Sequence, residues 1–147
     1  MSVRQNLISA CLLILSASLT TPVYARSVTD HLNRTVEVPD HIERVAVADI
    51  FPYASAACVY LGSCRKIVAM HPSSMNAARS GLLHELYPEV ADINTSVMQG
   101  AEVNLEALMG LRPDVVFVNA GNKRLIERLE AAGLPALAVS TGKWDYD

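Results

Sequence analysis

The sequence predicts an α/β fold in which a parallel sheet is flanked by helices, in the Rossmann-like manner, and preceded by a short β-hairpin. Short apolar segments alternate with helical segments along the chain. The apolar segments are apolar on both faces, and such strands need cover on both sides, as in a parallel sheet with right-handed crossovers. The 147 residues allow one domain with a substantial core.

Residues 1–25 have the features of a secretory signal peptide. The opening segment carries Arg4, residues 7–20 are apolar, and the small residues Val23 and Ala25 precede the expected cleavage site. Cys11 lies before most of the apolar segment, whereas a lipid-modified cysteine should follow it. We therefore expect a cleaved, soluble and secreted product. After residue 25 no apolar run approaches the ~18 residues that a membrane span needs, so we expect no direct membrane insertion.

The first half of the remaining chain, taken in order, predicts a hairpin, a strand, a helix and a second strand. Two alternating runs flank the turn at 32–34 and end at Pro39, which indicates the hairpin. An alanine-rich segment that stops at Gly62 is typical of a helix. The predicted ranges are 28–39 for the hairpin, 44–48 and 66–70 for the strands, and 52–61 for the helix.

The second half predicts three helical segments and two more strands. Asn104 is a good helix cap with an acid in the first turn behind it, and Gly133 ends an amphipathic helix. The stretch around Met98–Gly100 is interpreted as a plain loop. The predicted helical ranges are parts of 73–88, closed by Pro88, then 104 to about 111 and 123–132; the strands are 114–118 and 135–139.

The polar residues that follow the strands form the candidate ligand site, because ligands of open parallel sheets bind beyond the carboxyl ends of the strands. For Asp49 a helix cap is the favoured alternative, and for His71 an exposed loop residue that caps the next segment. Phe51 can equally face a ligand or fold into the core. Tyr53 and His71 qualify as metal ligands only if they face the site. The candidates are Asp49, Phe51, His71, Ser73, Gln99, Asn119, Gly121 and Asn122.

Several classes of function are disfavoured by what the sequence lacks. The net charge of −3 gives no electrostatic footprint for nucleic acid. The nucleophile elbow, the phosphate-binding loop and the dinucleotide fingerprint are all absent, and the four histidines are scattered. We therefore predict no catalytic residues, no metal site and no cofactor. Cys58 and Cys64 can form a disulfide in an oxidising compartment or remain buried thiols.

Ordered motifs in the chain resemble the periplasmic binding proteins of ABC importers for iron-siderophores, haem and cobalamin. The opening block runs from Val28-Thr29-Asp30 through Arg34 to Pro39 and on to Ile42-Glu43-Arg44-Val45. The second block contains Gln99-Gly100, Asn104-Leu105-Glu106, Leu111-Arg112-Pro113-Asp114-Val115-Val116 and Gly133-Leu134-Pro135. The resemblance covers nearly all of residues 28–140.

The resemblance implies a protein of two lobes joined by one long helix, with the ligand held between them. It also implies that Glu106, which spacing alone leaves as a favourable charge at a helix start, pairs with arginines of the inner-membrane permease. Residues 26–147 would then be the N-terminal lobe. The second lobe and the connecting helix are absent, so we expect a truncated form.

The resulting functional hypothesis is the solute-binding component of an ABC importer for a chelated metal. A ferric siderophore is the default by frequency in the family, and haem, cobalamin, nickel and molybdate stay open. One alternative is a single-lobe interaction module that docks on the permease without ligand. A second alternative is a small α/β enzyme that uses His71 and Asp49.

Overall fold

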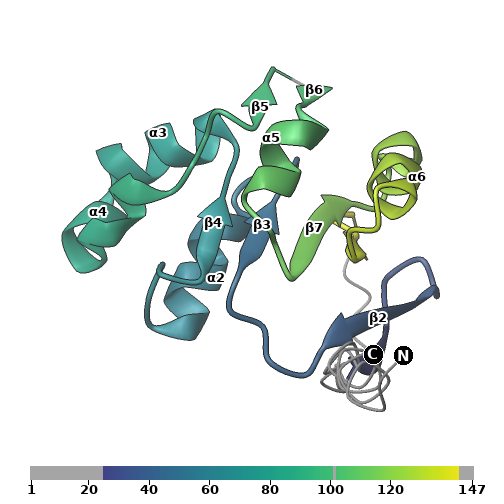
Figure 1. Cartoon of the computed structure of the whole chain (residues 1–147). Coiled ribbons are helices and arrows are strands. Elements are labelled where there is room, and N and C mark those ends of the chain that lie inside the picture. Colours follow the sequence, from purple (N-terminus) through teal and green to yellow (C-terminus); the bar gives the residue numbers. More distant parts are fainter. Residues whose placement is uncertain (1–24, 101, 143–147) are drawn as a thin grey trace, which may run out of the picture.

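A four-stranded parallel sheet forms the centre of the molecule. The computed structural model describes residues 25–100 and 102–142, so the predicted signal peptide lies outside the described residues except for Ala25. The strand order is β4-β3-β7-β8, with parallel pairing throughout (Figure 1). The strands are β3 (Val45–Val47), β4 (Ile67–Ala69), β7 (Val115–Asn119) and β8 (Ala136–Val139). This confirms the predicted fold class.

The predicted hairpin is present and protects one edge of the sheet. Strands β1 (Ala25–Thr29) and β2 (Thr35–Pro39) pair in antiparallel register. The turn between them contacts β8, where the amide of His31 donates to the carbonyl of Ala138 at 3.2 Å. The opposite edge, at β4, is bridged by Asn94, whose carbonyl accepts from the amide of Met70 at 3.1 Å. Both edges are therefore occupied by other parts of the chain.

The helices follow the predicted order and use the predicted ends. Gly62 ends α2 with φ at 66°, a left-handed conformation that glycine adopts at little cost. The side chain of Asn104 caps α5 through the amide of Ala107. Pro88 opens a 3-10 helix in addition to closing the helical segment before it. The bounds are α2 (Tyr53–Leu61), α3 (Pro72–Ser80), α4 (Leu82–Leu86), η1 (Pro88–Asp92), α5 (Leu105–Gly110) and α6 (Lys123–Ala131).

The segment interpreted as a plain loop around Met98 is a small β-ribbon, and that prediction is wrong. Strand β5 (Met98–Gln99) pairs in antiparallel register with β6 (Glu102–Val103). Two buried side chains, Met98 and Val103, lie opposite each other and attach the ribbon to the core. Strands of two residues are too short for a periodic pattern in the sequence.

The two faces of the sheet carry separate layers of the core. One face presents Ala46, Val116 and Val118, which pack against side chains of α5 and α6 such as Leu108 and Leu129. The other face presents alternate residues of the same strands, which pack against α2, α3 and the hairpin. No helix in the described part of the chain has the length and apolar character of a membrane span.

A disulfide joins the end of α2 to the loop that leads into β4. Cys58 and Cys64 are its two residues, their Cα atoms are 4.5 Å apart, and both side chains are buried. Glu89 fastens the same loop, because its carboxylate accepts from the hydroxyl of Ser63 at 2.9 Å and from the amide of Cys64 at 3.2 Å. The disulfide therefore closes a short, well-packed turn at the amino end of the sheet.

Candidate functional site

A pocket of about 400 Å³ lies beyond the carboxyl ends of β3 and β4. Its walls come from the loop after β3, the start of α3, the β5–β6 ribbon and the start of α6, which meet at this end of the sheet (Figure 1). Five of the predicted ligand residues line it: Asp49, Phe51, His71, Ser73 and Asn122. The position agrees with the rule that open parallel sheets bind ligands at this edge.

Asp49 holds two loops of the pocket together. One carboxylate oxygen accepts from the amide of Asn119 and the other from the side-chain amide of Asn122, each at 2.7 Å. The favoured alternative, that Asp49 caps the following helix, is wrong, because α2 begins after Pro52 without a side-chain cap. The carboxylate joins the loop after β3 to the loop after β7 and thereby fixes one wall.

His71 holds the facing wall with both ring nitrogens. Its Nδ1 accepts from the amide of Ser73 at 3.0 Å, so the predicted capping of the next segment is confirmed. Its Nε2 lies 3.0 Å from the carbonyl oxygen of Gly100 in the turn of the ribbon. The imidazole thus connects α3 to the β5–β6 ribbon across the pocket.

Three predicted ligand residues lie outside the pocket lining. Asn119 uses its side-chain oxygen to accept from the amide of Gly121 at 2.8 Å, which shapes the loop before α6. Gln99 is an exposed residue of β5. The lining consists of residues 49, 51, 71, 73, 98, 100, 102, 103 and 122, so Gln99, Asn119 and Gly121 do not contribute to it.

The ribbon supplies the pocket residues that sequence reasoning missed. Met98, Gly100, Glu102 and Val103 all line the pocket. The available signal was the pair of apolar residues on either side of Gly100, which is weak in so short a segment. The ribbon also brings an exposed carboxylate, since the side chain of Glu102 is 79% exposed.

The pocket combines an apolar floor with acidic rims. Met98 and Val103 are buried, and Phe51 presents a side chain that is 56% exposed. Asp49 and Glu102 are the charged side chains of the lining, and no lysine or arginine is among the described residues that form it. Low-charge ligands with apolar surface fit such a lining better than bare anions do.

Tyr53 does not face this pocket. Its ring contacts that of Phe117, with centroids 4.9 Å apart, and it lines a separate groove on the α2 face of the sheet. Burial raises the pKa of Tyr53, which keeps the phenol protonated and makes it a poor metal ligand. Among residues 25–100 and 102–142 no group of three metal-binding side chains is present.

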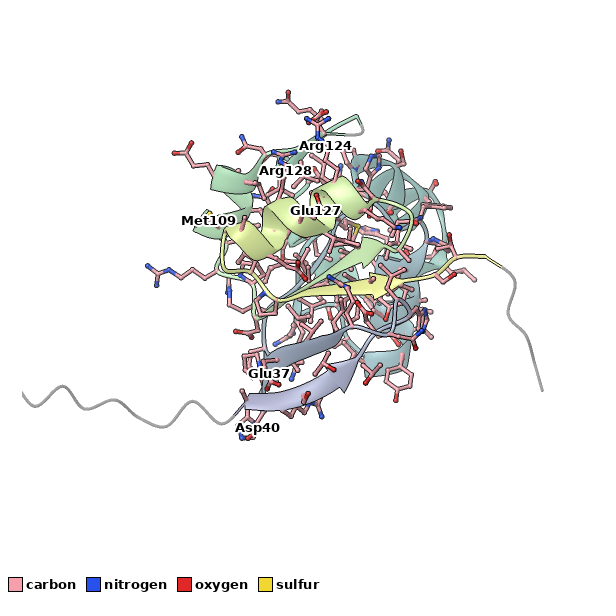
Figure 2. All side chains as sticks on the ribbon, turned by 90° about the vertical axis from the view of Figure 1, so that its right-hand side faces the viewer. Glu37, Asp40, Met109, Arg124, Glu127 and Arg128 are labelled. Carbon is pink, nitrogen blue, oxygen red and sulfur yellow. A yellow bond between two sulfur atoms is a disulfide. The ribbon has the colours of Figure 1, made fainter. Side chains whose placement is uncertain are left out.

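Glu106 lies in the first turn of α5, the helix that follows strand β6, and its side chain is exposed. Met109, one turn later on the same helix, is 47% exposed. Figure 2 shows Met109 at one side of the molecule, above Glu37 and Asp40 of the hairpin region. A carboxylate in the first turn and a thioether one turn later are thus both exposed on this short helix.

Comparisons with known proteins give relatives from one functional group. No protein-family model matches the chain. The molybdate-binding protein MolA of Haemophilus influenzae is 33% identical over 140 residues, which cover 92% of this chain and 37% of MolA. A structure of MolA bound to molybdate matches with a TM-score of 0.63 and 29% identity over 80% of this chain and 36% of that chain.

Two further structures extend this group. A periplasmic solute-binding protein from Veillonella parvula matches with a TM-score of 0.78 and 28% identity, over 82% of this chain and 36% of that chain. The haem-binding protein HmuT matches with a TM-score of 0.60 and 26% identity, over 85% of this chain and 37% of that chain. The chain therefore spans only about a third of the length of the proteins it matches.

Proposed function

We propose that this chain, whose homologues and structural neighbours are periplasmic solute-binding proteins of ABC transporters, forms one lobe of such a protein and binds a metal chelate. The pocket at the carboxyl edge of the sheet carries the proposal. Because the chain spans about a third of its relatives' length, this pocket corresponds to one side of a binding site. We expect a periplasmic protein that captures its solute and delivers it without chemistry.

The charge of the pocket favours a chelate over a bare oxyanion. Asp49 and Glu102 contribute carboxylates, and the described lining contains no lysine or arginine, although Arg128 of α6 lies 3.8 Å from the carboxylate of Glu102. A molybdate ion, the ligand named for MolA, would meet like charge here, whereas a neutral or cationic complex would not. The ring of Phe51 and the buried side chains of Met98 and Val103 suit the organic shell of a chelate. A ferric siderophore is the first ligand to test, followed by haem, cobalamin and nickel complexes.

Isothermal titration of the purified chain tests this proposal. We expect a neutral ferric hydroxamate siderophore to bind, with affinity well below that of a two-sided site because one side of the ligand stays in water. Molybdate and tungstate should give no heat above dilution. Binding of molybdate but of no chelate would contradict the ligand assignment. Absence of binding by every compound tested would contradict the binding role.

A pair of aromatic substitutions locates the binding site. Phe51→Ala should weaken chelate binding by about threefold to tenfold, the usual contribution of an aromatic contact. Tyr60→Ala is the matched control, because Tyr60 is also exposed but lies on α2 outside the pocket lining. Equal effects of the two substitutions would show that the chelate binds elsewhere.

The exposed carboxylate of Glu106 supports a second role, docking on a permease. Glu106 stands at the start of α5. In the described part of the chain, its carboxylate makes no hydrogen bond or ion pair. A rigidly held, exposed charge is suited to guiding and orienting an encounter with a cationic surface. An interaction module that docks without ligand would use the same surface.

A pull-down with detergent-solubilised permease separates docking from ligand capture. Glu106→Arg should abolish capture of the permease and leave chelate binding unchanged. Glu37→Arg is the matched reversal of an exposed charge on β2 of the hairpin, and it should leave capture intact. Equal capture by both variants would remove Glu106 from the docking surface.

A further inference from the structure

The imidazole of His71 is held in one defined tautomer by its two neighbours. The Ser73 amide can only donate, so Nδ1, which lies 3.0 Å from that nitrogen, must carry a free lone pair. The Gly100 carbonyl can only accept, so Nε2, which lies 3.0 Å from that oxygen, must carry the proton. Both contacts therefore require the neutral ring with its proton on Nε2.

This ring contacts two walls of the pocket, the start of α3 and the turn of the β5–β6 ribbon. Ser73 belongs to the first turn of α3, and Gly100 forms the turn of the β5–β6 ribbon with φ at 59°. The ribbon consists of two residue pairs, Met98 with Val103 and Gln99 with Glu102. So short a ribbon depends on contacts from outside for its position, and His71 supplies one directly at its turn.

We propose that His71 is a proton-sensitive positioning residue of the pocket, an inference that rests on the proposed binding function for its biological meaning. Protonation places hydrogen on Nδ1, so that both ring nitrogens become donors. The Ser73 amide then faces a donor and loses its acceptor, while Nε2 still donates to Gly100. The side-chain cap on α3 is then lost, whereas the backbone bonds from the amides of Ser74 and Met75 to the carbonyl of His71 remain, as does the contact with Gly100.

The charged groups nearest the ring come from several elements. Asp49, from the loop after β3, and Glu102, from β6, line the same pocket, and Glu102 lies 3.8 Å from the guanidinium of Arg128 of α6. The amino end of α3 carries partial positive charge. Proton binding to the ring removes one hydrogen bond from the first turn of α3, the bond to the amide of Ser73, a residue of the pocket wall.

The consequence for binding is a pocket that is best formed when His71 is neutral. Ser73 contributes an exposed side chain to the lining. Without its cap the amide of Ser73 is free to exchange with solvent, and the start of α3 holds this wall less firmly. A bound solute would accordingly be held more weakly in an acidic medium than in a neutral one.

Nuclear magnetic resonance of the free chain tests the inference without any ligand. Nitrogen spectra of the imidazole at about pH 8 should show the proton on Nε2. Between about pH 8 and about pH 5, the range in which histidines change charge, protection of the Ser73 amide against exchange should fall about fivefold to tenfold after correction for the intrinsic rate. The Ala107 amide is the internal control, because Asn104, a cap that does not titrate, holds it at 3.0 Å.

The variant His71→Asn keeps the cap and removes the proton switch. Asparagine is a strong helix cap, but its side chain is too short to span both contacts and does not titrate. Protection of Ser73 should then be independent of pH, while the amides of the ribbon exchange faster. A proton on Nδ1 at about pH 8, or a pH-independent Ser73 amide in the unsubstituted chain, would overturn the inference. Failure of the solute panel alone would contradict the binding role and leave this result standing.

Discussion

The two faces of the central sheet have the same kind of strand residues but different cover. On one face, Leu108 of α5 and Leu129 of α6 are 0% exposed and close over the strands. On the other, α2 and the hairpin leave a groove of about 550 Å³ between them, lined by residues such as Tyr53, Ala57 and Phe117. Two exposed apolar side chains of α2, Tyr60 and Leu61, are part of this groove. We call the two sides the sealed face and the open face.

The difference shows that an apolar strand predicts a layer of cover but not its completeness. Strand β7 alternates residues between the faces, with Val116 and Val118 on the sealed face and Val115 and Phe117 on the open one. Every one of them is apolar. Val115 is nevertheless fully buried, whereas Phe117 is only partly so. Stability should therefore respond very differently to equal substitutions on the two faces.

Truncation of a leucine on each face should give the largest contrast. Leu129→Ala removes a side chain that is 0% exposed, and we expect a loss of about 2–5 kcal/mol in the free energy of unfolding because a cavity remains. Leu61→Ala, at a side chain that is 44% exposed beside the groove, should cost less than about 1 kcal/mol. Urea denaturation followed by circular dichroism measures both. Equal losses would mean that the groove is closed in solution.

The join between the hairpin and the sealed face should be the next most sensitive point. Asp30, whose side chain is 1% exposed, accepts hydrogen bonds from the amides of Leu32, Arg34 and Ala138 and pairs with the guanidinium of Arg34. Arg34 in turn pairs with Glu130 of α6. We expect Asp30→Asn to cost about 2–3 kcal/mol, because it removes the charge from a buried, fully bonded group. Glu37→Gln, an exposed hairpin acid, is the control.

The same carboxylate makes stability depend on pH in the acid range. Burial alone would raise the pKa of Asp30, but the hydrogen bonds from Arg34, Ala138 and Leu32 outweigh it and lower the pKa. Its contribution is therefore full above the unfolded value of about 4 and is lost as pH falls through the folded value. The free energy of unfolding, measured as a function of pH, should fall in the acid range in the unsubstituted chain. It should fall less steeply in Asp30→Asn. The same dependence of the free energy of unfolding on pH in both proteins would show that Asp30 does not cause the loss of stability in acid.

Most of the fold could be predicted from the sequence because its signals are local and strong. Gly62 and Gly133 mark helix ends, Asn104 marks a helix start, and the apolar strands are bounded by these signals. The ribbon of β5 and β6 was missed because its strands are only two residues long. Its attachment depends on the burial of Met98 and Val103, a tertiary contact that no local pattern records.

The sequence predicted the position of the candidate site better than the roles of its individual residues. The carboxyl edge of the sheet was foreseen, and Asp49, His71 and Asn122 do meet there. Their hydrogen bonds could not be foreseen, because Asp49 bonds to residues about 70 positions later in the chain. The expected helix cap at Asp49 failed for this reason: a distant amide pair competes with the local one and engages both carboxylate oxygens.

Enlarging an alanine on each face should move stability in opposite directions. Ala46→Leu on the sealed face, where the side chain is 0% exposed, overfills a closed core and should cost about 1–3 kcal/mol. Ala57→Leu projects into the open groove and should stabilise by about 0.5–1 kcal/mol, since it buries apolar surface in vacant space and keeps a good helix former. Thermal unfolding monitors both variants. Destabilisation by Ala57→Leu would show that the groove has no room.

The smallest effect should come from the rim of the open face. Tyr60 is 91% exposed and touches the groove only at its edge, so Tyr60→Ser should leave the melting temperature unchanged within about 2 °C. It should, however, reduce retention on a hydrophobic matrix, because the ring contributes to the apolar surface beside the groove. Glu85→Ser, at an exposed position of α4, controls for the loss of a side chain. A clear fall in melting temperature would mean that Tyr60 folds over the groove in solution, so that the open face is closed by its own rim.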